Sequence, residues 1–174
     1  MSEVATMVDG VDLIGVGDGT QQYLTFLLAG EEYGVDILRV QEIKGWDSVT
    51  PIPNTPEYIR GVINLRGMIV PIIDLRLRFS LEQLEYGPTT VVIMLKVMTE
   101  GKQSRTMGIV VDGVSDVYNM PEDQIKASPD FGAAVETDFV KGLATVNDKM
   151  VIILDIDHML NSNELKTVAA GAKT

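Results

Sequence analysis

The chain has 174 residues, of which 25 are Asp or Glu and 14 are Lys or Arg, and its formal net charge is −11. This acidic balance argues against a protein that binds nucleic acid non-specifically, and against docking on an anionic membrane, because both need a dense basic face. There is no cysteine and a single histidine, His158, so disulfides, zinc–thiolate sites, iron–sulfur clusters and sites with two imidazoles are excluded. No basic leader and no apolar run of about 20 residues is visible, so we expect a cytoplasmic protein without direct membrane insertion.

In chain order, residues 1–20 are acidic and without a clear period, and we expect them to form a flexible tail. From residue 21 onward, short apolar segments alternate with Gly, Asn, Asp and Pro, a pattern typical of strands and turns. The expected strands cover residues 23–28, 31–35, 38–43, 59–65, 68–73, 89–98, 105–111, 114–118, 139–146 and 149–154. Pro71 cannot donate a ladder hydrogen bond, so its strand is expected at a sheet edge or a bulge. A C-terminal helix and a tail at 164–174 are expected last.

Short helices are expected between the strands. Asp74 and Asp155 each precede one, where an Asp side chain accepts a backbone N–H bond, so we interpret both carboxylates as caps. Another helical turn is predicted at 56–58, with Thr55 as its N-cap. His158 lies near the end of the second helix without an obvious nucleophile beside it, and a structural role is the expected one.

The sequence contains signs of an internal duplication. Residues 58–79 align without a gap on residues 139–160 when shifted by 81 positions. The identical pairs are Gly61 with Gly142, Val70 with Val151, Ile72 with Ile153 and Asp74 with Asp155. A second register, offset by 74, places Gly34 on Gly108. Chance similarity between apolar hairpins is the alternative, but two registers in the same order favour two small barrels that share a core.

No catalytic constellation is visible in the sequence. Instead, single charges stand inside apolar segments: Arg39 and Glu42 in DILRVQEI, and Arg66 in INLRG. We hypothesise that Glu42 and Arg66 pair across the barrel; two solvated charges are the alternative. An acidic, duplicated all-β chain of this kind indicates a binding module rather than an enzyme.

Several segments, taken together, resemble the CheW family of chemotaxis coupling proteins. They are GEEYGVDILRVQEIKG (30–45), IPNTPEYIRGVINLRGMIVPIIDLR (52–76), TTVVIMLKV (89–97), MGIVVDGVSDV (107–117) and VKGLATVNDKMVIILDID (140–157). The resemblance runs from about residue 21 to 163. Because the sequence ends at Thr174, with no room for a receiver or kinase domain, we expect the similarity to be to the stand-alone coupling protein.

The resemblance implies two intertwined five-stranded β-barrel subdomains of the src-homology-3 type within one domain at 21–163, with boundaries interleaved near 85–90 and 155. It implies no enzymatic activity and no cofactor. It implies two partners, the cytoplasmic signalling tip of a chemoreceptor and the CheW-like regulatory domain of the chemotaxis histidine kinase. The protein would assemble receptor arrays and allow control of kinase autophosphorylation. We expect it to be monomeric when free.

The family's receptor-facing groove lies between the subdomains and is largely apolar. The positions that match it are Val40, Glu42, Ile43, Gly61, Arg66, Val91, Val92, Val114 and Val117. An amphipathic helix lays its apolar face into such a slot, and Gly61 would permit close approach. The kinase contact is expected at one end of one subdomain, and the resemblance assigns no residues to it.

Two other functions remain open at this point. The first is a carboxylate-based hydrolase or sugar-binding β-protein, in which Asp112 and Asp116 would be the first candidates, with carboxyl groups about 5–10 Å apart. The second is a kinase-inhibiting decoy that uses the same fold without binding a receptor.

Overall fold

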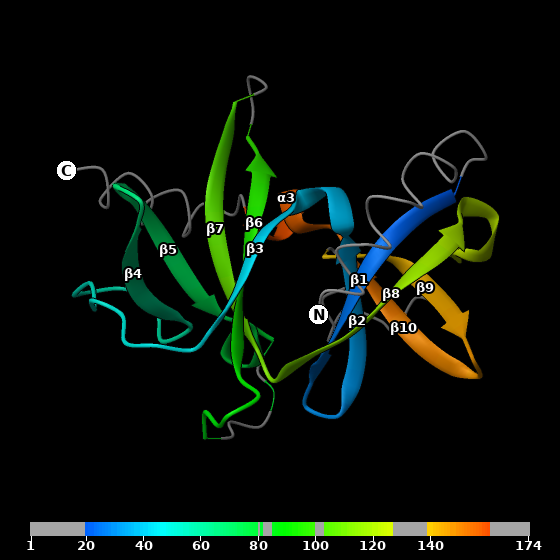
Figure 1. Cartoon of the computed structure of the whole chain (residues 1–174), viewed down its shortest axis with the longest axis horizontal. Coiled ribbons are helices and arrows are strands. Elements are labelled where there is room, and N and C mark those ends of the chain that lie inside the picture. The colour runs from blue at the N-terminus through cyan, green and yellow to red at the C-terminus, as the bar shows by residue number, and fades with distance from the viewer. Residues whose placement is uncertain (1–19, 80, 82–84, 100–102, 127–138, 161–174) are drawn as a thin grey trace.

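The computed structural model describes residues 20–79, 81, 85–99, 103–126 and 139–160 (Figure 1). The expected tail at 164–174, any helix beyond residue 160 and the expected tail at 1–20 lie outside this range, except that Thr20 is described and begins β1. The strands are β1 (Thr20–Leu28), β2 (Glu31–Asp36), β3 (Val40–Gly45), β4 (Ile59–Leu65), β5 (Met68–Asp74), β6 (Val91–Met98), β7 (Ser104–Val111), β8 (Gly113–Pro121), β9 (Val140–Val146) and β10 (Lys149–Leu154). The short helices are η2 (Ile37–Arg39), α2 (Leu75–Arg78), η3 (Glu122–Gln124) and α3 (Ile156–Leu160).

The strands form two five-stranded sheets with the same internal order. One sheet runs β8-β1-β2-β10-β9 and the other runs β3-β6-β7-β5-β4. The chain therefore begins in the first sheet, builds the whole of the second with β3 to β7, and returns to complete the first (Figure 1). The two halves are intertwined, which confirms the expected all-β architecture of two five-stranded units.

Each sheet closes on itself through one isolated bridge. In the second sheet the chain beyond β3 returns to the far edge strand, where Thr50 and Val62 exchange two backbone hydrogen bonds of 2.9 Å. In the first sheet Lys126, beyond β8, makes the same exchange with Leu143 of β9, at 2.8 and 2.7 Å. We call the closed sheets barrel 1 (β1, β2, β8–β10) and barrel 2 (β3–β7).

The pairing registers unite the two offsets found in the sequence. Ile72 of β5 lies opposite Gly108 of β7, and Ile153 of β10 lies opposite Gly34 of β2, both in parallel pairs. Shifting Ile72 by 81 gives Ile153, and shifting Gly34 by 74 gives Gly108, so both offsets describe the same contact. Matching topology and matching register are what an internal duplication predicts.

The apolar run of β6 is buried on both faces of the strand over most of its length. In β6, Ile93 and Leu95 face a core shared by the two barrels, whereas Val92 and Met94 face the interior of barrel 2. This alternation explains why VVIML reads as a continuous apolar run, since residues 92–95 are buried on both sides of the strand and Val91 is half-buried. Phe26 of barrel 1 lies in the same shared core.

Two local expectations were wrong. Leu38 and Arg39 lie in η2 rather than in a strand, because the Asp36 carboxylate accepts the amide of Leu38 at 3.0 Å and starts a helical turn. Thr55 caps no helix; residues 57–58 form a turn, and the Thr55 hydroxyl donates to the carbonyl of Ile52 at 2.9 Å.

Pro71 was expected at a sheet edge or a bulge. The β4–β5 pairing has a register shift between Ile59 and Gly61, beside the pair of Val62 and Pro71, which agrees with a bulge. Pro71 itself lies in β5, an internal strand between β7 and β4, rather than at an edge. Its partner Val62 directs both backbone groups to Thr50, so the missing N–H of Pro71 removes no bond to β4. The pairing of β5 with β7 begins one residue later, at Ile72.

The two short helices begin as predicted. The Asp74 carboxylate accepts the amide of Arg76 at 2.9 Å, and the Asp155 carboxylate accepts the amide of His158 at 3.1 Å.

Across the described residues, none of the helices has the length and apolar character needed to cross a bilayer.

Candidate partner-binding surface

The nine residues expected at a receptor-facing surface come from four strands and one turn. Val40, Glu42 and Ile43 lie on β3, Gly61 on β4, Arg66 in the β4–β5 turn, Val91 and Val92 on β6, and Val114 and Val117 on β8. β3 pairs with β6, so the three β3 residues lie beside Val91 and Val92 in barrel 2. β8 belongs to barrel 1, so the set spans both barrels.

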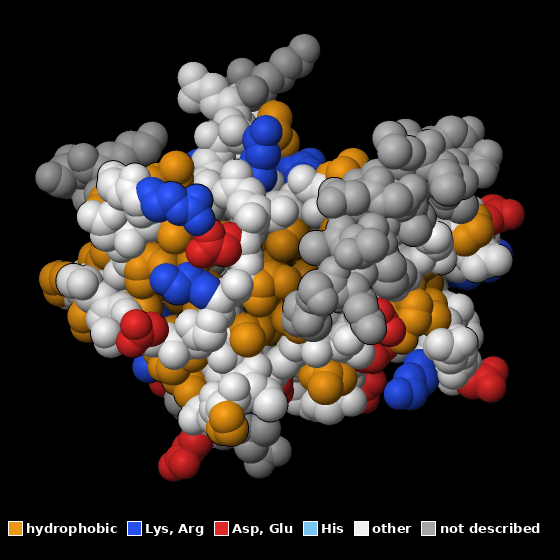
Figure 2. Space-filling model, viewed as in Figure 1, with side chains coloured by type: hydrophobic (Ala, Val, Ile, Leu, Met, Phe, Trp, Pro, Cys, Tyr) orange, Lys and Arg blue, Asp and Glu red, His pale blue; other side chains and the backbone are white. Residues whose placement is uncertain are grey.

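Four of these side chains form an apolar rim around the shared core. Val40, Ile43, Val91 and Val114 are half-buried and pack against the buried core from its margin. Their outer sides remain accessible, and apolar side chains gather on the visible surface between the two halves of the molecule (Figure 2). We refer to Val40, Ile43, Val91 and Val114 as the apolar rim.

Three other members of the set are buried, and their burial limits what they can contact. Val117 and Val92 are each 4% exposed, Val117 in the shared core and Val92 inside barrel 2. Gly61 is buried with φ +142°, and a Cβ there would lie 2.2 Å from the carbonyl oxygen of Thr50. The missing side chain therefore makes room for the chain's own barrel closure rather than for a partner.

The two charged members form an ion pair. Arg66 Nη2 donates to Glu42 Oε1, which joins the β4–β5 turn to β3. The Arg66 side chain is 76% exposed and that of Glu42 is 29% exposed. Solvent screens such a pair, so its contribution to stability is about 0–1 kcal/mol, and the guanidinium remains available to another carboxylate.

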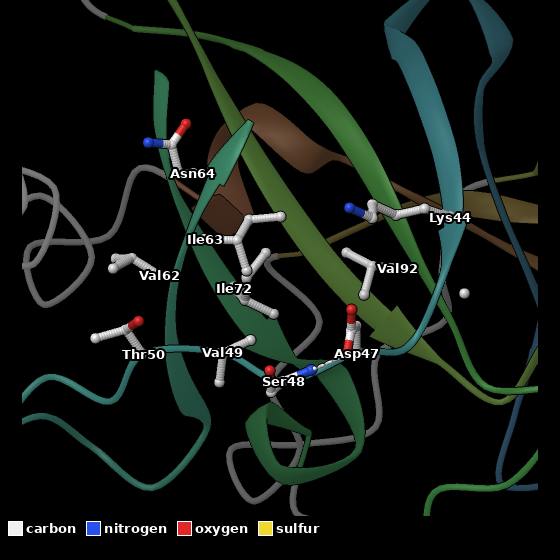
Figure 3. Close-up of a pocket in the computed structure, with 11 residues that line it drawn as sticks. Lys44, Asp47, Ser48, Val49, Thr50, Val62, Ile63, Asn64, Ile72 and Val92 are labelled. Atoms are coloured by element: carbon white, nitrogen blue, oxygen red, sulfur yellow. Dashed lines mark hydrogen bonds between the residues drawn. The ribbon is translucent and has the colours of Figure 1, made fainter. Parts of the chain in front are cut away.

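A hollow of about 270 Å³ opens between β3 and β4 of barrel 2, and it was not anticipated from the sequence (Figure 3). β3 and β4 make no ladder with one another, and the loop after β3 reaches β4 through the bridge from Thr50 to Val62. The lining residues are Lys44, Gly45, Asp47, Ser48, Val49, Thr50, Val62, Ile63, Asn64, Ile72 and Val92. Polar side chains surround an apolar floor. Because Lys44 and Gly45 of β3 line the hollow, it adjoins the β3 part of the expected surface.

A buried polar cluster supports this side of barrel 2. Asp74 is 1% exposed and accepts a hydrogen bond from the Tyr86 hydroxyl, whose ring packs on Trp46 with centroids 4.4 Å apart. The pKa of Tyr86 is raised above its ordinary value, mainly by burial and to a smaller extent by the hydrogen bond to Asp74. The cluster fixes Trp46 at the start of the loop that lines the hollow.

The carboxylates proposed for a hydrolase are engaged in the fold. Asp112 accepts the amide of Ala29 at 2.8 Å and lies 3.2 Å from the Nε atom of Arg76. Asp116 accepts the amide of Val117 at 2.8 Å and is exposed on β8. Within the described part of the chain, no group of three His, Asp or Glu side chains is placed to hold a metal ion.

Comparison with known proteins gives one consistent result. The family model of the CheW-like domain matches residues 22–164. Chemotaxis protein CheW of Klebsiella aerogenes is 47% identical over 154 residues, covering 88% of this chain and 90% of that protein. Chemotaxis protein CheW of Rhizobium meliloti is 33% identical over 147 residues, covering 84% and 92%. The crystal structure of the scaffolding protein TtCheW from Thermoanaerobacter tengcongensis superposes with a TM-score of 0.73 at 36% identity, covering 83% of this chain and 94% of that one.

Proposed function

The chain belongs to the CheW family of chemotaxis scaffolding proteins, and we propose that it is a non-enzymatic cytoplasmic adaptor between chemoreceptors and the chemotaxis histidine kinase. One partner is the cytoplasmic signalling tip of the receptor, and the other is the CheW-like regulatory domain of the kinase. By holding both, the adaptor assembles receptor arrays and places kinase autophosphorylation under receptor control.

The observation that carries the receptor half of the proposal is the apolar rim together with the exposed Arg66, whose partner Glu42 lies on β3 between the rim residues Val40 and Ile43. The rim residues Val40 and Val91 belong to barrel 2, and Val114 belongs to barrel 1, so a helix laid across the junction would contact both barrels. Helix-in-groove recognition uses an apolar face of this kind with polar contacts at its margin. Arg66 provides a cation at that margin for an acidic side chain of the receptor.

The kinase half of the proposal needs a second surface, and Leu38 is the candidate for its centre. At 70% exposure, Leu38 is the most exposed of the large apolar side chains in the described residues. It lies on η2, where the chain crosses from barrel 1 to barrel 2. An apolar side chain held outward on a short helical turn is a surface that a partner can cover.

Sedimentation with receptor signalling fragments, and separately with the kinase regulatory domain, tests both halves. Val114→Trp fills the apolar rim at a half-buried site and is expected to weaken receptor binding tenfold or more while kinase binding persists. Leu38→Asp is expected to do the reverse. Met150→Asp, at another exposed apolar site (53%), serves as the matched control for both surfaces. Receptor binding that is unchanged in Val114→Trp would exclude the rim as the docking surface.

A further inference from the structure

Arg39 and Asp157 form a two-pronged ion pair where the two barrels meet. Arg39 lies on η2, in the segment that crosses from barrel 1 to barrel 2, and Asp157 lies on α3, which follows β10 of barrel 1. Nη1 and Nη2 of Arg39 donate to Oδ1 and Oδ2 of Asp157, both at 2.8 Å. The pair also holds the end of β6 in barrel 2, because Arg39 donates to the carbonyl of Lys96 at 3.0 Å and the amide of Met98 donates to Asp157 at 2.8 Å.

A second ion pair joins the barrels in the opposite sense. Arg76 lies on α2, which follows β5 of barrel 2, and Asp112 lies in the segment that crosses back to barrel 1. Their Nε and Oδ1 atoms are 3.2 Å apart. Asp112 holds the end of β1 in barrel 1, since its side chain accepts the amide of Ala29 at 2.8 Å and its own amide donates to the carbonyl of Leu27 at 3.0 Å.

The two pairs occupy corresponding places in the duplicated fold, one residue out of register in the crossing segments, with their charges exchanged. The offset of 81 between α2 and α3 places Arg76 on Asp157. The offset of 74 places Arg39 on Gly113, the residue after Asp112 in the other crossing segment. The helix carries the arginine in one pair and the aspartate in the other.

The backbone groups that the two pairs hold are also equivalent. Thr25 lies opposite Gly34 in β1–β2, and Met94 lies opposite Gly108 in β6–β7, so β1 aligns on β6 with an offset of 69. The equivalent groups are the carbonyls of Leu27 and Lys96 and the amides of Ala29 and Met98. Each barrel therefore offers the same carbonyl and amide at the end of one strand. In barrel 2 Arg39 binds the carbonyl and Asp157 the amide, whereas in barrel 1 Asp112 binds both and Arg76 in turn pairs with Asp112.

We propose that Arg39–Asp157 and Arg76–Asp112 are two charge-reversed copies of one clasp, and that these clasps fix the orientation of the barrels relative to each other. The shared apolar core is non-directional and attracts the barrels in many orientations. Charge-assisted hydrogen bonds are narrow in distance and angle, so they select one of those orientations. Arg39 and Asp157 are therefore positioning residues.

The clasp of Arg39 and Asp157 is the one that can be opened without burying an unpaired charge. Its side chains are 26% and 32% exposed, whereas Arg76 in the other clasp is 2% exposed. The hydrogen bond to Asp157 is the main cause that raises the pKa of Arg39 above its ordinary value. Removing Arg39 leaves Asp157 in contact with solvent, so the variant is expected to fold.

The absence of cysteine makes the orientation directly measurable. In the full chain, Met68→Cys/Lys149→Cys places two spin labels at exposed, equivalent positions of the β4–β5 and β9–β10 hairpins, one in each barrel. Arg39→Ala and Asp157→Ala are each expected to broaden the distribution of distances between the labels. Exchange of the Met98 amide is expected to accelerate about tenfold in Asp157→Ala, because that amide loses its acceptor.

Two further variants make the test specific. Ser115→Ala removes a hydrogen bond to Glu32 that lies within barrel 1, and it is expected to leave the distances unchanged. The exchanged pair Arg39→Asp/Asp157→Arg, which copies the polarity of the other clasp, is expected to narrow the distribution again. A wild-type distribution in Arg39→Ala, or a distribution in the exchanged pair as broad as in Arg39→Ala, would overturn the proposal.

A functional measurement can accompany the distances, and it rests on the proposed function. Because the rim residues belong to both barrels, Arg39→Ala is expected to weaken receptor binding several-fold. The label distances decide the clasp whether or not receptor binding is found, so the two proposals fail separately.

Discussion

Ile72 of β5 packs directly over Gly108 of β7, its partner in the parallel pairing of barrel 2. A Cβ added at position 108 would lie 2.6 Å from Cδ1 of Ile72 and 2.9 Å from Cγ1 of Val92. Barrel 1 repeats the contact more loosely, with the added Cβ of residue 34 lying 3.1 Å from Cδ1 of Ile153. The equivalent glycines Gly108 and Gly34 therefore differ in how well they would tolerate an added side chain.

Alanine at these two positions is expected to be destabilising to different extents. Gly108→Ala overpacks barrel 2 and should lower the free energy of unfolding by about 1–3 kcal/mol. Gly34→Ala should cost less, because its tightest contact gives way by a few tenths of an ångström. Urea denaturation measures both, and Gly108→Ala/Ile72→Val should recover part of the loss. An equal or larger loss in Gly34→Ala would contradict this packing.

Gly61 is expected to be needed for folding rather than for direct contact with a receptor. A side chain at this position meets the Thr50 carbonyl, and the φ of +142° is one that side chains rarely adopt. Gly61→Ala should therefore lower the free energy of unfolding by about 3 kcal/mol or more. Gly45→Ala is the control, because nothing lies within 4 Å of its added Cβ. A Gly61→Ala protein as stable as the wild type that fails to bind receptor would show a direct role.

The ion pair of Arg66 and Glu42 is expected to contribute little to stability. With Arg66 at 76% exposure, a double-mutant cycle of Arg66→Ala and Glu42→Ala should give a coupling energy of about 0–1 kcal/mol. Receptor binding is expected to fall in Arg66→Ala while the thermal midpoint stays within about 2 °C of the wild type. A coupling energy above about 2 kcal/mol would mean that the pair is part of the fold rather than of the binding surface.

Tyr86 is expected to give the protein a stability that is lost in alkali. Burial and the bond to Asp74 raise its pKa in the folded state above the ordinary value of 10.0. The unfolded chain then loses its proton first, so the contribution is complete below about pH 10 and declines as the pH rises through the folded pKa. The stability difference between wild type and Tyr86→Phe should therefore shrink above about pH 10. A difference that stays constant from about pH 8 to 12 would contradict the buried bond.

Much of the fold follows from turn chemistry and alternation. The dipeptides Ala29-Gly30, Arg66-Gly67 and Asn147-Asp148 adopt positive φ at both residues, as two-residue hairpin turns require, and each lies in the gap between two of the strands expected from the sequence. The 3-10 turn at 37–39 could not be predicted in this way, because the apolar spacing there also fits a strand. One side-chain bond from Asp36 decides between the two.

The candidate site was only partly accessible to sequence reasoning. Resemblance supplied the strands of the apolar rim, but not that Val91 faces the rim while Val92 faces the interior of barrel 2. The hollow was missed because the segment at 47–50 has no apolar period and reaches β4 only through the bridge at Thr50. Asp112 was considered as a catalytic acid because the sequence around it shows no structural partner. Its partner Arg76 is distant in sequence and approaches it only where the chain crosses between the two barrels.

The central claim, that the chain couples receptor to kinase, is tested most directly by one ternary measurement. Receptor signalling fragments in membranes are mixed with the kinase, with and without this protein, and both sedimented kinase and its autophosphorylation are measured. We predict that the protein brings kinase into the receptor pellet and changes its autophosphorylation, and that folded Arg66→His does neither. Kinase recovery and activity that are the same with and without the protein would contradict the adaptor function.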